Sequence, residues 1–224
     1  MIKLVVLDLD QTLIDSIHRF YETFNNVIVS FGGSKVSWDE FFKAYCEDKL
    51  DYFIPKTCKR EDFWKEFRRR YSSWIHEKDK PMKGALETLK WLNNRGFKIV
   101  VTTGREASAE DIWRELRKFK LARYVDSVYT LKDQDPKYED VLFSRRGLLM
   151  KIISKYNVNP KETVFVGDYW VDMLSGSRVG VITVGVLTGC ESEEKLKKHG
   201  AKYVIKDISS LPKLIEMLEK ASNV

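Results

Sequence analysis

The sequence has no long apolar run, few cysteines and very little glutamine. No stretch of its 224 residues approaches the ~20 consecutive apolar residues of a membrane-spanning helix, so a transmembrane protein is not expected. The N-terminal apolar run passes directly into Asp8, which differs from a secretory signal peptide. The three cysteines are scattered and lack CxxC spacing, which argues against a zinc site or a framework of several disulfides. These absences predict a cytoplasmic protein.

The charge balance also excludes more than it indicates. The 39 basic and 33 acidic residues give a formal net charge of +6, which indicates a solvated, ion-paired surface. Glutamine occurs only as Gln11 and Gln134 among many lysines, arginines and glutamates, a composition that leans toward a thermophilic source.

Apolar periodicity predicts an α/β fold. Five of the six residues before Asp8 are apolar, as in a central strand covered on both faces. From residue 84 onward helical and strand-like segments alternate, with strands expected at 97–102, 125–131, 163–167, 181–187 and 203–205. Strands separated by helices imply right-handed crossovers, so we expect a doubly wound parallel sheet.

The segment between the first strand and this alternating part has a different pattern. Residues 16–80 show only helical periods, expected as helices at 17–31, 38–46, 50–54 and 61–76. Their many aromatic residues predict the core of a small helical bundle, which Pro81 ends. We therefore expect an α/β core made of residues 1–15 and 81–224, with an all-helical domain, residues 16–80, inserted after the first strand.

Polar residues gather where the predicted strands end. The first strand ends in Asp8 and Asp10, and the strand at 97–102 runs into Thr103 and Gly104, where a glycine lets backbone N–H groups approach a ligand. In an open parallel sheet, sites form beyond the carboxyl ends of the strands. These residues are therefore expected at one edge.

A third strand end adds two more carboxylates. The strand at 163–167 ends in Gly167 and Asp168, and Asp172 follows one helical turn later on the same side. Four carboxylates at one edge would repel each other strongly, and a hard cation bound by oxygens, typically Mg²⁺, would relieve that repulsion. Mg²⁺ commonly uses only one or two protein carboxylates, which leaves others for chemistry and proton transfer.

These motifs resemble those of the haloacid dehalogenase superfamily, in its phosphatase branch. Its DxDxT motif matches residues 8–12, its second motif matches Thr103, with Thr102 as the alternative, and its GDxxxD motif matches residues 167–172. The resemblance covers the whole α/β part and is to phosphoglycolate phosphatase-like members, whereas the inserted helices resemble the superfamily's C1-type cap in position and helical character only. The resemblance implies a Rossmann-like core and a Mg²⁺-dependent phosphatase that acts on a small phosphorylated substrate.

The resemblance also implies roles for these residues. Asp8 would be the nucleophile that forms an aspartyl-phosphate, and Asp10 the general acid and base. Mg²⁺ would be held by Asp8, the backbone carbonyl of Asp10 and Asp168, with support from Asp172. Thr103 and backbone N–H groups near Gly104 would bind the transferring phosphoryl group.

One motif of the superfamily is missing. Its third motif is a lysine, often followed by proline, before the helix that leads into the Gly-Asp strand. That place holds Arg145, our candidate replacement, because an arginine can pair with a carboxylate and with phosphoryl oxygens. Arg146, Lys137 and Lys151 remain alternatives.

Two other functions remain open at this stage. A phosphotransferase or sugar phosphomutase would use the same residues with a different acceptor. A less favoured alternative is nucleic-acid binding through basic residues at 59–60 and 68–70, which interleaved acids dilute. The sequence indicates neither the substrate nor the oligomeric state.

Overall fold

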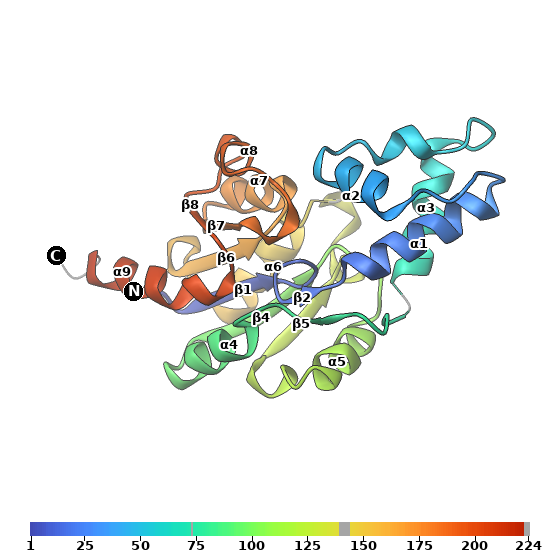
Figure 1. Cartoon of the computed structure of the whole chain (residues 1–224). Coiled ribbons are helices and arrows are strands. Elements are labelled where there is room, and N and C mark those ends of the chain that lie inside the picture. Colours follow the sequence, from blue (N-terminus) through green and yellow to red (C-terminus); the bar gives the residue numbers. More distant parts are fainter. Residues whose placement is uncertain (73, 139–143, 222–224) are drawn as a thin grey trace. The chain divides into compact units, whose positions relative to one another are not determined.

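The structure is a computed structural model that describes residues 1–72, 74–138 and 144–221 (Figure 1). The chain forms two compact units, one made of residues 1–15 and 80–224 and the other of residues 16–79. The first is called the core unit below, and the second the inserted unit.

The core unit is built on a six-stranded sheet with the order β5-β4-β1-β6-β7-β8, in which every neighbouring pair is parallel. The central strand, β1, is fully buried. The expected doubly wound α/β fold is confirmed. The strands are β1 (Leu4–Asp8), β4 (Lys98–Thr103), β5 (Ser127–Thr130), β6 (Thr163–Gly167), β7 (Ile182–Val186) and β8 (Tyr203–Ile205).

Helices cover both faces of this sheet because side chains alternate along each strand. Val5 and Leu7 of β1 face one apolar cluster, which is formed with helices α4 (Ala85–Asn94), α5 (Ala109–Lys118) and α9 (Leu211–Ala221). Leu4 and Val6 face a second cluster, formed with α6 (Arg146–Tyr156). Helices α7 (Trp170–Val179) and α8 (Glu193–Lys198) pack together through Met173 and Leu196. The sheet is therefore the middle layer of three.

Short elements complete the core unit. Strands β2 (Ile14–Asp15) and β3 (Lys80–Pro81) pair antiparallel, with Asp15 opposite Lys80. Lys80 thus belongs to the core unit, and the inserted unit ends one residue before the expected boundary. Strands of two residues carry no periodicity, so this pair could not be predicted from the sequence. In the part of this unit that the structure describes, 3-10 turns lie at Ala122–Tyr124, Leu131–Asp133, Pro136–Tyr138, Pro160–Glu162, Leu187–Gly189 and Ile208–Ser210.

The inserted unit is helical, as its sequence period predicts. It contains α1 (Ile17–Ser30), α2 (Trp38–Cys46), a 3-10 turn (Leu50–Phe53) and α3 (Arg60–Tyr71). Phe24 lies at the centre of its core, with ring centroids 5.7 Å from Phe41 and 5.4 Å from Phe63. Helix α3 ends before residue 76, where we had expected its end. A turn takes over there, in which the Asp79 carboxylate accepts the His76 amide at 2.7 Å.

Among the residues that the structure describes, no helix is long and apolar enough to span a membrane.

Candidate active site

The carboxyl ends of three neighbouring strands place the predicted site residues together. β1 lies between β4 and β6, with Asp8 opposite Thr102 and Leu7 opposite Val166. Asp8, the last residue of β1, therefore lies level with Gly167, the last residue of β6, and Asp168 comes directly after it. This arrangement comes from the strand register, so the local sequence at each strand end decides what the site contains.

Three carboxylates form a buried cluster at this edge. Asp8, Asp168 and Asp172 each offer an oxygen within 4.8 Å of the others, and all three residues are buried. Thr12, from the segment after β1, donates its hydroxyl to Asp168 at 3.4 Å. The sequence had placed these three acids together on the expectation that their strands are neighbours.

Two glycines make room for this cluster. A Cβ on Gly189 would overlap the Asp168 carboxylate, and a Cβ on Gly167 would overlap that of Asp172. Gly167 belongs to the expected GDxxxD motif, whereas Gly189 follows β7 and was not predicted as a site residue. Its only sequence signal is that it, too, follows the end of a predicted strand.

Arg145 joins the cluster from the start of α6. Its guanidinium donates hydrogen bonds to Asp8 and to Asp172, and its side chain is only 8% exposed. Its backbone N–H donates to Ser175 Oγ at 3.1 Å, and its guanidinium carbon lies 5.5 Å from the centre of the Phe165 ring. Arg145, our candidate for the third motif, thus lies beside Asp8 and Asp172.

The alternative cations lie elsewhere. Arg146 is exposed, as are Lys137, which pairs with Asp135 at 2.8 Å, and Lys151, which donates to the Asp133 carbonyl at 2.7 Å. Among the described residues, Arg145 is the one of the four candidates that bonds to the Asp8 cluster. Gln134 bonds to residues on both sides of Arg145: its side chain donates to the Ser144 carbonyl at 3.0 Å and accepts the Leu148 amide at 3.2 Å.

The cluster is electrostatically unfavourable without a cation. Burial raises the pKa of Asp8, with the charge of Asp10 adding to that rise and Arg145 opposing it. Burial raises the pKa of Asp168 well above its ordinary value, and the charge of Asp8 adds to the effect. Three carboxylates against one guanidinium are a hard-oxygen donor set with surplus negative charge, which fits a divalent cation such as Mg²⁺.

The end of β4 offers donors for an anion. Thr103 Oγ1 accepts the Arg105 amide at 3.2 Å, which leaves its own O–H free to donate to a ligand. The space at Gly104 is open, since a Cβ there would meet no atom within 4 Å. Thr102, the alternative, is fully buried beside Asp8, and among the described residues its hydroxyl has no hydrogen-bond partner.

Arg105, just after Thr103 and Gly104, makes a contact that we did not predict. Its guanidinium binds both carboxylate oxygens of Asp10, with Nε 2.8 Å from Oδ2, and it also donates through Nη1 to Glu115 Oε2 at 2.6 Å. Arg105 and Glu115 are buried, whereas the Asp10 side chain is 21% exposed. The signal in the sequence was a glutamate, Glu115, on the otherwise apolar face of α5.

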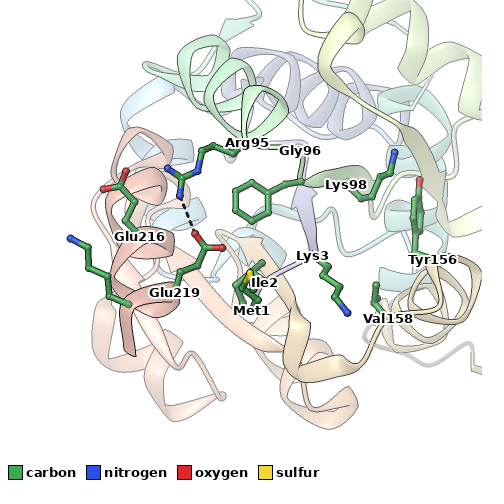
Figure 2. Close-up of a pocket in the computed structure, with 12 residues that line it drawn as sticks. Met1, Ile2, Lys3, Arg95, Gly96, Lys98, Tyr156, Val158, Glu216 and Glu219 are labelled. Carbon is green, nitrogen blue, oxygen red and sulfur yellow. Dashed lines mark hydrogen bonds and ion pairs between the residues drawn. The ribbon is translucent and has the colours of Figure 1, made fainter. Parts of the chain in front are cut away.

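An open hollow in the core unit lies far from this site. It is lined by residues at or just before the start of β1 and β4, including Ile2, Lys3 and Lys98. The ion pair of Arg95 with Glu219 at 3.1 Å lies beside it (Figure 2). These residues are at the amino ends of the strands, whereas Asp8 is at the carboxyl end of β1. The hollow is therefore separate from the carboxylate cluster.

Three of the basic residues considered for nucleic-acid binding, Arg60, Arg69 and Arg70, are engaged in ion pairs. Arg60 pairs with Asp51 at 2.5 Å, and Glu66 binds both Arg69, at 2.7 Å, and Arg70, at 2.5 Å. These acids reduce the positive field that nucleic acid would need.

Comparison with known proteins identifies relatives along almost the whole chain. The family model described as haloacid dehalogenase-like hydrolase matches residues 5–186. A pyrophosphatase PpaX from Bacillus pumilus is 27% identical over 215 residues, covering 84% of this chain and 95% of that protein. A phosphoglycolate phosphatase from Pseudomonas fluorescens is 21% identical over 221 residues, covering 93% of this chain and 78% of that protein.

The fold has close counterparts among solved structures. A haloacid dehalogenase-like family hydrolase from Streptococcus pneumoniae superposes with a TM-score of 0.76 at 15% identity. The match covers 96% of this chain and 98% of that one, so the likeness in fold extends over both units.

Proposed function

The chain belongs to the haloacid dehalogenase-like hydrolases and is a phosphatase, and on this premise we propose that it hydrolyses a small phosphorylated metabolite through an aspartyl-phosphate on Asp8. The observation that carries the proposal is the position of Asp8. It ends the central strand, bonded to Arg145 and clustered with two further buried carboxylates.

In the first step, an Asp8 oxygen attacks phosphorus and the bond from phosphorus to the leaving oxygen breaks. Asp10, two residues along the chain and partly exposed, gives its proton to the leaving alkoxide. Arg145 neutralises part of the charge between the Asp8 nucleophile and its anionic target. The product of this step is an aspartyl-phosphate and a free alcohol.

In the second step, water attacks the phosphorus of the aspartyl-phosphate and Asp10 takes a proton from that water. The bond between phosphorus and the Asp8 oxygen breaks, which releases inorganic phosphate and restores the carboxylate. Thr103 and the open backbone at Gly104 support the proposal, because their donors can hold the phosphoryl oxygens in both steps.

We also propose that Mg²⁺ is the cofactor. Asp8, Asp168 and the backbone carbonyl of Asp10 would hold the ion, and Asp172 would support it while bonded to Arg145. A bound Mg²⁺ supplies charge neutralisation at the phosphoryl group. The surplus of buried negative charge at this cluster is the support for this assignment.

The inserted unit, residues 16–79, is proposed to act as a cap that contributes substrate contacts and excludes water. The support is its place in the chain, directly after the first strand and its catalytic segment. The relatives named for pyrophosphate and phosphoglycolate carry small phosphorylated substrates in their names, and we extend that class to this chain.

Phosphate release by wild type and by Asp8→Asn, each with and without Mg²⁺, tests the proposal. We expect Mg²⁺-dependent turnover in wild type and a loss of at least about 10³-fold in kcat for the variant, because the nucleophile is gone. Metal-dependent turnover that survives the substitution would exclude Asp8 as the nucleophile. Transfer of phosphate to a second hydroxyl compound without release to water would favour the phosphotransferase alternative.

A further inference from the structure

Glu115 is an unexpected residue at its position in α5. It is 2% exposed and shares the inner face of the helix with Ile112 and Leu116, which are fully buried in the apolar core. A buried carboxylate costs several kcal/mol unless it is paired and hydrogen-bonded. Its partner is Arg105, which binds it through Nη1 at 2.6 Å and Nη2 at 3.4 Å.

Arg105 is fixed at both ends. Its amide donates to Thr103 Oγ1 at 3.2 Å, and its carbonyl accepts the Leu131 amide at 3.2 Å. Its side chain lies between Glu115 and Asp10 and presents the edge formed by Nε and Nη2 to both oxygens of Asp10. A planar guanidinium held in this way leaves the Asp10 carboxylate one orientation.

We propose that Arg105 and Glu115 are positioning residues for the phosphatase reaction, with Glu115 orienting Arg105 and Arg105 holding the Asp10 carboxylate toward the leaving group. The inference rests on the proposed function, in which Asp10 exchanges the protons. Arg105 acts through its contact with Asp10, and Glu115 acts through its contact with Arg105.

This grip leaves Asp10 able to react. A carboxylate oxygen has two lone pairs, so an Asp10 oxygen that accepts a hydrogen bond from Arg105 can still exchange a proton. The Asp10 side chain is 21% exposed, which lets a leaving oxygen approach it. Proton transfer needs heavy atoms within about 2.6–3.2 Å, so an acid that rotates freely would spend little time in reach.

Glu115 decides which way Arg105 faces. An arginine side chain has several rotamers, and Arg105 without Glu115 could turn its fork away from Asp10. The short bond from Glu115 to Nη1 occupies the end of the guanidinium opposite Nε. Removing the charge of Glu115 should therefore loosen Asp10 with no change at Asp10 itself.

The experiment compares two esters whose leaving groups differ in their need for a proton. We expect Glu115→Gln and Arg105→Lys to lower kcat/KM for an alkyl phosphate such as glycerol phosphate by about tenfold or more, a fraction of the ~10²–10⁴-fold that a general acid contributes. For p-nitrophenyl phosphate, whose leaving group departs as a stable anion, we expect less than about a twofold loss. Glu110→Gln and Arg117→Lys, an exposed pair on the same helix, are the matched controls and should change neither value.

A double-mutant cycle separates positioning from a general structural role. In an Asp10→Asn background, which has no acid to orient, Glu115→Gln and Arg105→Lys should add less than about a twofold further loss on the alkyl ester. Thermal melts identify any variant that fails to fold, and the cycle then uses the other one. Arg105→Lys keeps the charge, so it tests the planar fork alone.

Three results would overturn the inference. They are equal losses on both esters, losses that persist in the Asp10→Asn background, and no loss on either ester. A rise in KM that persists without Asp10 would instead make Arg105 a substrate contact. If wild type hydrolysed no phosphate ester, the proposed function itself would be refuted. That result is measured on wild type alone, so it is distinct from any result obtained with the variants.

Discussion

The core unit and the inserted unit each bury an arginine, but the charge around the two arginines differs. In the core unit Arg145 bonds to Asp8 and Asp172, two of three clustered carboxylates, so negative charge is in surplus. In the inserted unit Arg19 pairs with Asp79 at 2.8 Å, and both side chains are fully buried. Arg19 also donates to the Trp74 carbonyl at 3.1 Å.

This difference in charge distinguishes a candidate active site from an ion pair that stabilises the fold. A paired buried charge fixes local structure, here by tying the first turn of α1 to the last residue of the inserted unit. A surplus of buried charge destabilises the fold, and the raised pKa of Asp168 reflects that cost. Such a surplus is useful only if a cation or a reaction centre makes use of it.

The largest expected effect comes from removing part of the surplus. Asp168→Asn should melt at a higher temperature than wild type in the absence of metal, because one repelling carboxylate is gone. If Mg²⁺ is the cofactor, as proposed, the variant should also lose the stabilisation that the ion would give wild type, about 2.7 kcal/mol at a hundredfold excess over Kd, and nearly all turnover. Calorimetric melts with EDTA and with Mg²⁺ measure both changes.

Asp135→Asn is the control for that experiment, because Asp135 is exposed and pairs with Lys137 away from the cluster. Its melts should respond to Mg²⁺ as wild type does. If Asp168→Asn proved less stable than wild type without metal, Asp168 would be a structural partner, and the contrast between the two arginines would fail.

The second effect comes from breaking the buried pair of the inserted unit. Asp79→Asn leaves the Arg19 guanidinium buried without its carboxylate, which should cost about 3 kcal/mol or more. Hydrogen exchange should show the loss in amides of α1 and α3. If the inserted unit is a cap, hydrolysis of metabolite phosphates should fall more than hydrolysis of p-nitrophenyl phosphate.

An exposed pair in the same unit is the matched comparison. Glu47→Gln removes the partner of Lys49, an exposed pair at 2.7 Å, and should destabilise the fold far less than Asp79→Asn does. If Asp79→Asn lowered the hydrolysis of metabolite phosphates and of p-nitrophenyl phosphate equally, the result would argue against a cap.

The sequence predicted the parts of the site that strand ends determine. Asp8 and Thr103 are the last residues of largely buried strands and Asp168 directly follows one, and parallel topology brings such ends to one edge. Arg145 was predicted as the replacement for the missing lysine of the third motif. The structure brings it to Asp8 from the start of α6.

What the sequence could not indicate depends on contacts between distant segments. Gly189 lies against Asp168 only after β7 is placed beside β6, and Glu115 meets Arg105 only after α5 packs onto the sheet. Gln134 had been weighed only as composition, yet it bonds to Ser144 and Leu148, on either side of Arg145. Periodicity describes one element at a time, so it is silent on such pairs.

The smallest expected effect tests the exposed end of the comparison. In the inserted unit, hydrogen bonds from Arg69 and then Arg70 lower the pKa of Glu66 from 4.5 to about 2. Because the folded pKa is depressed, Glu66 stabilises the fold above about pH 4.5, and this contribution disappears as the pH falls toward 2. Glu66→Gln should therefore lower stability at pH 7 by at most about 1 kcal/mol, less in high salt, since Arg69 is exposed. Urea unfolding of wild type and variant from pH 7 to 2.5 measures the difference, which should shrink on acidification. A loss at pH 7 as large as that of Asp79→Asn would show that burial is not what distinguishes the two pairs.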